Sequence, residues 1–76
     1  MVFEKVKAII ADELNIKPEK ITMESNLVED LEADSLDAVE IIVRLEEEFN
    51  LEVEDNAAES IKTVGDLVKC IEELIK

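Results

Sequence analysis

The chain has 76 residues, of which 47% are hydrophobic, and a formal net charge of −13. A chain of this length folds as one small domain with a modest core, so we expect residues 1–76 to form a single domain. The strong negative charge disfavours nucleic acid and anionic membranes as partners, because both attract positive charge. No stretch approaches the roughly 18 apolar residues that integral membrane insertion needs.

The net charge is concentrated in the middle of the chain. Between Ile21 and Ile61 there are fourteen of the 21 acidic residues and a single base, Arg44, whereas seven acids balance seven lysines elsewhere. A solvated face that keeps the protein soluble and a docking surface for basic partners both agree with this distribution.

The start of the chain and its cysteine content bear on location. Glu4, Lys5 and Lys7 interrupt the apolar run that a signal peptide would need. Cys70 is the single cysteine, which excludes an internal disulfide and favours a reducing compartment. We therefore expect a cytoplasmic protein, in which Cys70 is a small packing residue of the last helix rather than a reactive thiol.

The first expected element is an amphipathic helix over residues 2–14, because apolar residues recur there at helical spacing. Residues 15–34 lack a clear period and predict a long loop with a short turn near residues 18–20. A loop of this length in a compact domain is usually functional or pinned by its own side chains. The expected pins are Ile16, Ile21, Leu27, Val28 and Leu31.

A second helix is expected over residues 34–49, with Asp34 as the N-cap and Asp37 placed to complete a capping box. Asn50 is a plausible terminator, and residues 55–60 predict a short helical turn or two. Thr63 then caps a final helix from residue 64 to about residue 75, which Gly65 weakens. The expected fold class is all-α, a small four-helix bundle of three longer helices and one short helix, with a long first loop.

The second helix has two apolar faces. The core face gathers Ala38, Ile41, Ile42, Leu45 and Phe49. The opposite face carries Leu36 and Val43 among carboxylates that include Glu40 and Glu47. Single exposed apolar residues usually have no meaning, but two of them ringed by acids favour a small docking site that steers and seats a basic partner.

Ser35 lies at the start of this helix. A serine at a helix start is common, but free backbone N–H groups there also favour a bound anion such as a phosphodiester. A catalytic serine needs a base, and the chain contains no His, so we expect no enzyme activity. Metal sites are not expected either, because the chain has one Cys and lacks the glycine spacing of calcium-binding loops, although weak divalent binding by clustered carboxylates stays open.

The ten residues from Leu31 to Glu40 read LEADSLDAVE. This run resembles the modification site of the acyl carrier proteins of dissociated (type II) fatty acid synthesis, and the likeness extends to residues 6–10, 28–31, 45–49 and 61–64. It implies a single acyl carrier domain over residues 1–76, with 4′-phosphopantetheine attached to Ser35 from coenzyme A by a phosphopantetheinyl transferase. Acyl chains would then be held as thioesters on the arm and delivered to fatty acid biosynthesis enzymes.

The resemblance also implies a set of partners and a surface that they recognise. The partners are malonyl transferase, ketoacyl synthases, reductases, dehydratases and acyltransferases with basic docking patches, and the chain itself is expected to be a monomer. The implied docking residues are Asp34, Leu36, Asp37, Glu40, Val43, Glu46, Glu47, Asp55 and Glu59.

Three positions depart from the family pattern. Glu32 stands where the family usually has Gly, Glu54 where it often has Pro, and Val43 where it more often has Met. These differences affect the loop before the site, the start of the short helix and the choice of partner. Two alternatives remain at this point: a carrier for another pathway, such as polyketide assembly or D-alanyl transfer, and an acidic interaction module that is never modified.

The concentrated charge generates a prediction about stability. Self-repulsion among the acids should lower the melting temperature at low ionic strength and be relieved by salt or divalent cations, since the screening length falls from about 30 Å at 0.01 M to about 3 Å at 1 M. Thermal unfolding followed by circular dichroism across this range should show a rising midpoint. A midpoint that does not depend on ionic strength would contradict destabilisation by repulsion among the acidic residues.

Overall fold

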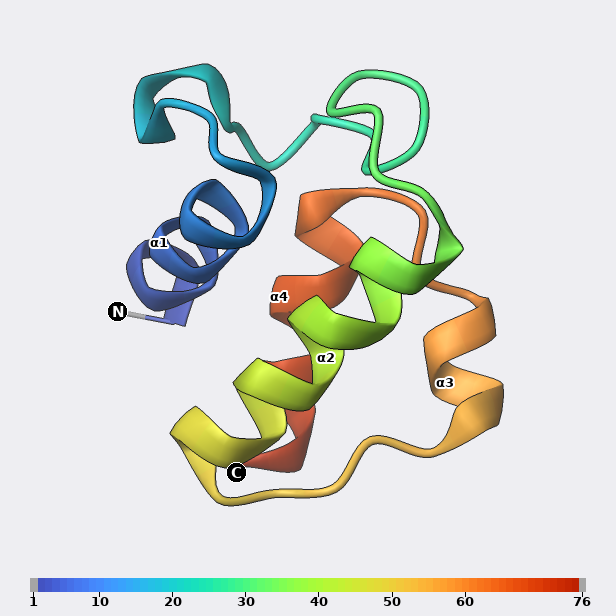
Figure 1. Ribbon diagram of the computed structural model, residues 1–76. Coiled ribbons are helices and arrows are strands. Elements are labelled where there is room, and N and C mark those ends of the chain that lie inside the picture. Colours follow the sequence, from blue (N-terminus) through green and yellow to red (C-terminus); the bar gives the residue numbers. More distant parts are fainter. Residues whose placement is uncertain (1, 76) are drawn as a thin grey trace.

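The computed structural model describes residues 2–75, except for the side chain of Asp55. It confirms the expected all-α four-helix class and the predicted order of elements (Figure 1). The expected turn after the first helix is a short 3₁₀ helix, η1. The elements are α1 (Val2–Leu14), η1 (Pro18–Lys20), α2 (Ser35–Phe49), α3 (Asp55–Glu59) and α4 (Val64–Leu74).

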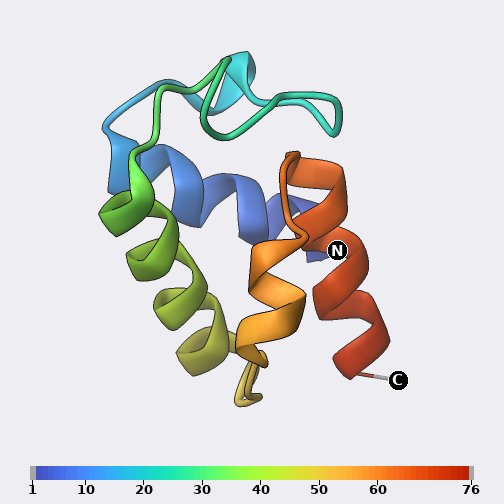
Figure 2. The same cartoon turned by 90° about the vertical axis from the view of Figure 1, so that its right-hand side faces the viewer.

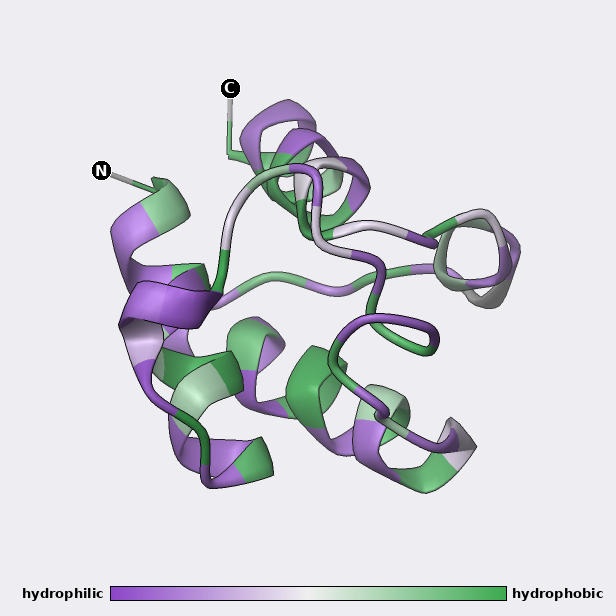
Figure 3. Cartoon of the chain, turned by 90° about the horizontal axis from the view of Figure 1, so that it is seen from above, coloured by the Kyte–Doolittle hydropathy of each residue, from purple (hydrophilic) through white to green (hydrophobic). Residues whose placement is uncertain are grey.

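The three longer helices surround one aliphatic core. Helix α1 packs against both α2 and α4, and the short α3 lies between α2 and α4 in the view of Figure 2. Apolar and polar residues are interspersed along the helices (Figure 3), and each of the three longer helices turns one apolar stripe toward the core. Full burial of one such side chain stabilises the fold by about 1.5–3 kcal/mol. The largest fully buried side chains are Val6, Ile10, Ile41, Leu45, Val64, Leu67 and Ile71.

Local sequence signals set the ends of the helices. Helix α4 begins at a capping box in which the Asp66 N–H donates to Thr63 Oγ1 at 3.1 Å and the Thr63 N–H donates to Asp66 Oδ2 at 3.2 Å. Helix α2 ends at Asn50, whose φ of 54° is the left-handed conformation that stops a helix. Helix α3 begins after Glu54, whose φ of −71° is one that Pro also adopts, so the departure at this position leaves the short helix in place.

The long loop between α1 and α2 is only partly pinned as expected. Ile21 and Leu27 are buried and Ile16 and Leu31 are half-buried, but Val28 is 63% exposed, so its expected role as a pin is wrong. Residues 26–31 are stabilised by polar contacts instead, and an apolar-pattern argument does not detect these contacts.

Asn26 supplies most of these polar contacts. Its side-chain Oδ1 accepts hydrogen bonds from the backbone N–H groups of Val28 and Glu29, both at 2.9 Å. Its own N–H donates to Asp30 Oδ2 at 2.7 Å, and its carbonyl accepts from Asp30 and Leu31. An Asn that satisfies neighbouring backbone groups in this way fixes a turn without burying apolar surface.

Glu32 lies just beyond this turn and has a φ of 57°. Residues with a Cβ pay roughly 1–2 kcal/mol for this left-handed conformation, whereas Gly adopts it freely. This gives a physical reason for the Gly that the family pattern has here. The next residue, Ala33, is buried, and its N–H donates to the Leu27 carbonyl at 2.9 Å, so the strained backbone is held in place.

The same loop is tied to the start of α4 by backbone hydrogen bonds. Leu27 N–H donates to the Lys62 carbonyl at 3.0 Å, and Val64 N–H donates to the Ser25 carbonyl at 2.9 Å. Gly65 N–H donates to the Met23 carbonyl at 2.8 Å. A Cβ added at Gly65 would lie 2.8 Å from that same carbonyl oxygen, closer than real Cβ atoms approach. Glycine is therefore required here by the closeness of the loop.

Replacing Gly65 by Ala should destabilise the protein by about 1–3 kcal/mol, because the added methyl group pushes the loop away from α4. Helix propensity alone predicts the opposite, a gain of up to about 1 kcal/mol. Urea unfolding of Gly65→Ala, with the exposed Lys69→Ala of the same helix as a control, separates the two effects. A Gly65→Ala variant more stable than the parent would refute the close contact.

Replacing Glu32 by Gly should stabilise the protein by about 0.5–1 kcal/mol, since relief of the left-handed strain exceeds the extra flexibility that Gly gives the unfolded chain. Glu32→Ala is the matched control, because it removes the carboxylate but keeps the Cβ. Urea unfolding midpoints should rank Gly above Ala. Equal midpoints for the two variants would show that charge, not backbone strain, governs this position.

Candidate functional site

Ser35 is the first residue of α2, and its side chain is exposed. The capping box beneath it forms as predicted: Asp37 N–H donates to Asp34 Oδ1 at 2.9 Å, and Asp34 N–H donates to Asp37 Oδ2 at 3.3 Å. The capping carboxylates therefore accept from backbone groups, and no described residue hydrogen-bonds the Ser35 hydroxyl. The exposed Ser35 lies at the positive end of a helix, where an attached phosphate is favoured.

The backbone before Ser35 is fixed rather than free. Ala33 is 2% exposed and bonded to Leu27, and Leu27 is bonded in turn to the segment that leads into α4. The serine is thus presented by a rigid helix start and an anchored loop. Such a support holds a covalently attached group at a defined point on the surface.

The exposed side of α2 carries an apolar patch larger than the sequence analysis recognised. Leu36 is 64% exposed and Val43 45% exposed, as expected, and Val39 is 55% exposed beside them. Val39 lies only about 40° around the helix from Val43, so the same helical geometry could have identified it. With Glu40 and Arg44 these three residues line a shallow hollow of about 350 Å³. We call these five residues the α2 patch.

The end of α1 borders this patch, which the sequence analysis did not anticipate. Arg44 Nη1 donates to Asp12 Oδ2 at 2.9 Å and to Glu13 Oε1 at 3.3 Å. Both bonds raise the pKa of Arg44, and the bond to Asp12 has the larger effect. A hydrogen bond to the nearby Glu13 carboxyl is the main cause that raises the pKa of Glu40 above its ordinary value.

The remaining predicted docking residues divide between free and engaged side chains. Glu47 and Glu59 are exposed. Glu46 is half-buried, and its Oε2 accepts from the Val53 N–H at 2.6 Å, so this carboxylate stabilises the loop after α2. The side chain of Asp55 lies outside the described part of the chain.

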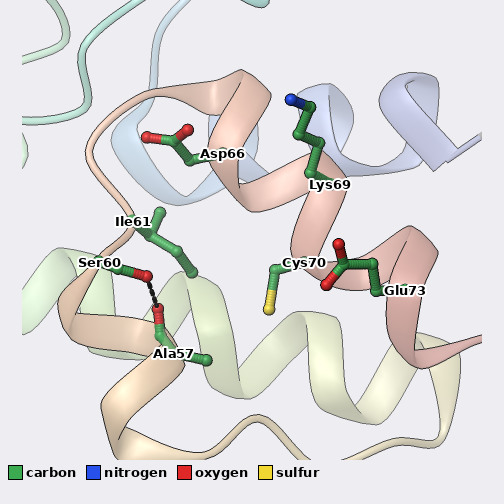
Figure 4. Close-up of a pocket in the computed structure, with 7 residues that line it drawn as sticks. All are labelled: Ala57, Ser60, Ile61, Asp66, Lys69, Cys70 and Glu73. Atoms are coloured by element: carbon green, nitrogen blue, oxygen red, sulfur yellow. Dashed lines mark hydrogen bonds between the residues drawn. The ribbon is translucent and has the colours of Figure 1, made fainter.

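A separate cavity of about 190 Å³ lies between α3 and α4 (Figure 4). The half-buried Cys70 faces it, and burial followed by the charge of Glu73 raises the pKa of its thiol. Ser60 Oγ donates to the Ala57 carbonyl at 2.9 Å. The Asp66 carboxylate is held by the backbone N–H groups of Lys62 and Thr63, which lowers its pKa. A thiol with a raised pKa is not an activated nucleophile, and the Ser60 and Asp66 side chains beside it are already hydrogen-bonded to the backbone.

Within residues 2–75, no group of three or more His, Cys, Asp or Glu side chains is arranged to hold a metal ion. None of the described helices is both long enough and apolar enough to cross a membrane.

Comparison with known proteins gives consistent matches over most of the chain. Residues 4–71 match the family described as "Phosphopantetheine attachment site". An acyl carrier protein of Wolinella succinogenes is 51% identical over 71 residues, which cover 93% of each chain. An acyl carrier protein of Thermosynechococcus vestitus is 54% identical over 70 residues, which cover 92% of this chain and 86% of the relative.

Solved structures also match over nearly the whole chain. A putative acyl carrier protein from Mycobacterium tuberculosis superposes with a TM-score of 0.90 at 34% identity, covering 96% of this chain and 97% of that one. The acyl carrier protein from Enterococcus faecalis superposes with a TM-score of 0.80 at 38% identity, covering 96% and 92%.

Proposed function

This chain belongs to the acyl carrier protein family, and from that premise we propose that Ser35 is the residue that bears its phosphopantetheine arm. As a family member the chain is a carrier of 4′-phosphopantetheine and not an enzyme. The observation that carries the assignment to Ser35 is its place: an exposed hydroxyl on the first residue of α2, within LEADSLDAVE.

The attachment chemistry requires little of the chain itself. The Ser35 oxygen attacks the pantetheine-bearing phosphorus of coenzyme A, a phosphodiester forms, and adenosine 3′,5′-bisphosphate leaves. The serine proton must go to a base, and the chain has no His and no described group bonded to this hydroxyl. The base therefore belongs to the transferase, and Ser35 acts as its substrate.

The carrier role depends on recognition by other enzymes. In our proposal the arm's thiol holds acyl groups as thioesters, and the chain delivers them as a cytoplasmic monomer to the enzymes of fatty acid synthesis. Exposed Leu36, Val39 and Val43 provide an apolar seat, and Glu40 and Glu47 steer basic patches toward it. Engagement of Glu46 with Val53 supports a smaller role in docking for Glu46 than for its neighbour Glu47.

Mass spectrometry tests the assignment of Ser35 directly. Incubation of the apo-protein with coenzyme A and a phosphopantetheinyl transferase should add about 340 Da, the mass of the arm. Ser35→Ala should abolish the gain, whereas Ser60→Ala, at another exposed serine, should keep it. Circular dichroism is used to check that each variant is folded, so that a missing mass gain is not caused by unfolding. A folded native chain that gains no mass would contradict the proposal.

Loading experiments then test the pathway. Holo-protein from this reaction should accept a malonyl group from a fatty-acid malonyl transferase, and Ser35→Ala should not. Mass gain without malonyl loading would favour a carrier for polyketide or D-alanyl chemistry over fatty acid synthesis. The two steps are read separately, so failure of the second leaves the attachment site intact.

A further inference from the structure

Arg44 is the feature of the acidic segment that the proposed function does not explain. It is the only base between Ile21 and Ile61, and it lies on the α2 patch rather than on a remote surface. Its side chain is 38% exposed. A positive charge at the edge of a surface that is otherwise acidic must affect which partner can approach.

The guanidinium of Arg44 is anchored to the end of α1 through one of its nitrogens. Two carboxylates from the last residues of α1, Asp12 and Glu13, accept from the same nitrogen, Nη1, at 2.9 and 3.3 Å. No described residue accepts from Nε or Nη2. The planar group is therefore anchored at Nη1 and keeps the donors of Nε and Nη2 available for a partner.

The charges along this face of α2 have a definite order. Glu40, Arg44 and Glu47 are spaced at i, i+4 and i+7, so they share one side of the helix. At 1.5 Å per residue, Arg44 lies about 6 Å along the axis from Glu40 and about 4.5 Å from Glu47. A partner that docks here meets acid, base and acid in turn, next to the apolar seat.

We propose that Arg44 is a specificity determinant of the docking face, selecting partner proteins whose basic patch is interrupted by a carboxylate that meets its guanidinium. This inference rests on the proposed function, in which the exposed face of α2 docks partner enzymes. Bases on either side of that carboxylate pair with Glu40 and Glu47. A lysine or arginine placed opposite Arg44 is repelled, so an uninterrupted basic patch is disfavoured.

The competing explanation is that Arg44 only links α1 to α2. Two variants separate these roles. Arg44→Gln removes the charge that a partner would meet and also the link to α1. The double variant Asp12→Asn with Glu13→Gln removes both charged partners of Arg44 within α1 but leaves the guanidinium on the patch.

The test uses full-length holo-protein of each variant as substrate for the ketoacyl synthase and malonyl transferase of the same organism. For the enzyme that carries the complementary carboxylate, Arg44→Gln should raise KM about fivefold or more with kcat unchanged, as expected for loss of a charged contact made on docking. The Asp12→Asn, Glu13→Gln variant should change KM by less than about twofold. Substituting each Asp or Glu of the enzyme's patch by Asn or Gln should reveal one whose effect disappears in Arg44→Gln.

Three outcomes would overturn this inference: no change in KM for Arg44→Gln with either enzyme, an equal rise in KM for the α1 double variant, or no partner carboxylate that couples to Arg44. Each variant is first shown to gain the phosphopantetheine mass at Ser35 with excess transferase. A native chain that gains no mass refutes the proposed function itself. A native chain that gains mass while KM ignores Arg44 refutes only the role of Arg44.

Discussion

The structure depends on the backbone bridge between the long loop and the start of α4. Three hydrogen bonds join Met23, Ser25 and Leu27 to residues 62–65, far along the sequence. Without them, the roughly twenty-residue loop between α1 and α2 would be held only by its few buried side chains. Buried backbone groups need partners, and here each of the two segments supplies them for the other. The bridge fixes where the end of the loop lies relative to α4, and this sets the point at which α2 and its first residue, Ser35, begin.

The constraint extends from this bridge to the attachment point. Leu27 accepts from Ala33, Glu32 takes the left-handed conformation between the turn and the cap, and Asp34 closes the start of the helix. A strained residue persists only where the surrounding contacts determine its conformation. The backbone on both sides of Glu32 is bonded to fixed elements, so the strain is tolerated. Rigid presentation of Ser35 is therefore a product of the loop and α4 as much as of α2.

The sequence predicted the elements well because their signals are local. The caps at Asp34 and Thr63, the terminator Asn50 and the apolar periods all act within a few residues, and each appears in the structure. Contacts between distant segments were not predictable. Nothing local reveals that Gly65 faces a loop carbonyl, so its presence was interpreted only as a weak point in a helix.

The same limit applied to the site. The helix start and the exposed face of α2 followed from periodicity, but the engagement of Glu46 with Val53 required knowledge of how the next loop folds back. Contact between Arg44 and the end of α1 likewise depends on how two helices pack. Acidic residues that look alike in the sequence thus separate into those bonded within the fold and those left for partners. Charge alone cannot make this distinction, but the bonding of each carboxylate does: Glu46 is bonded to the next loop, Glu40 lies against the Glu13 carboxyl, and Glu47 stays exposed.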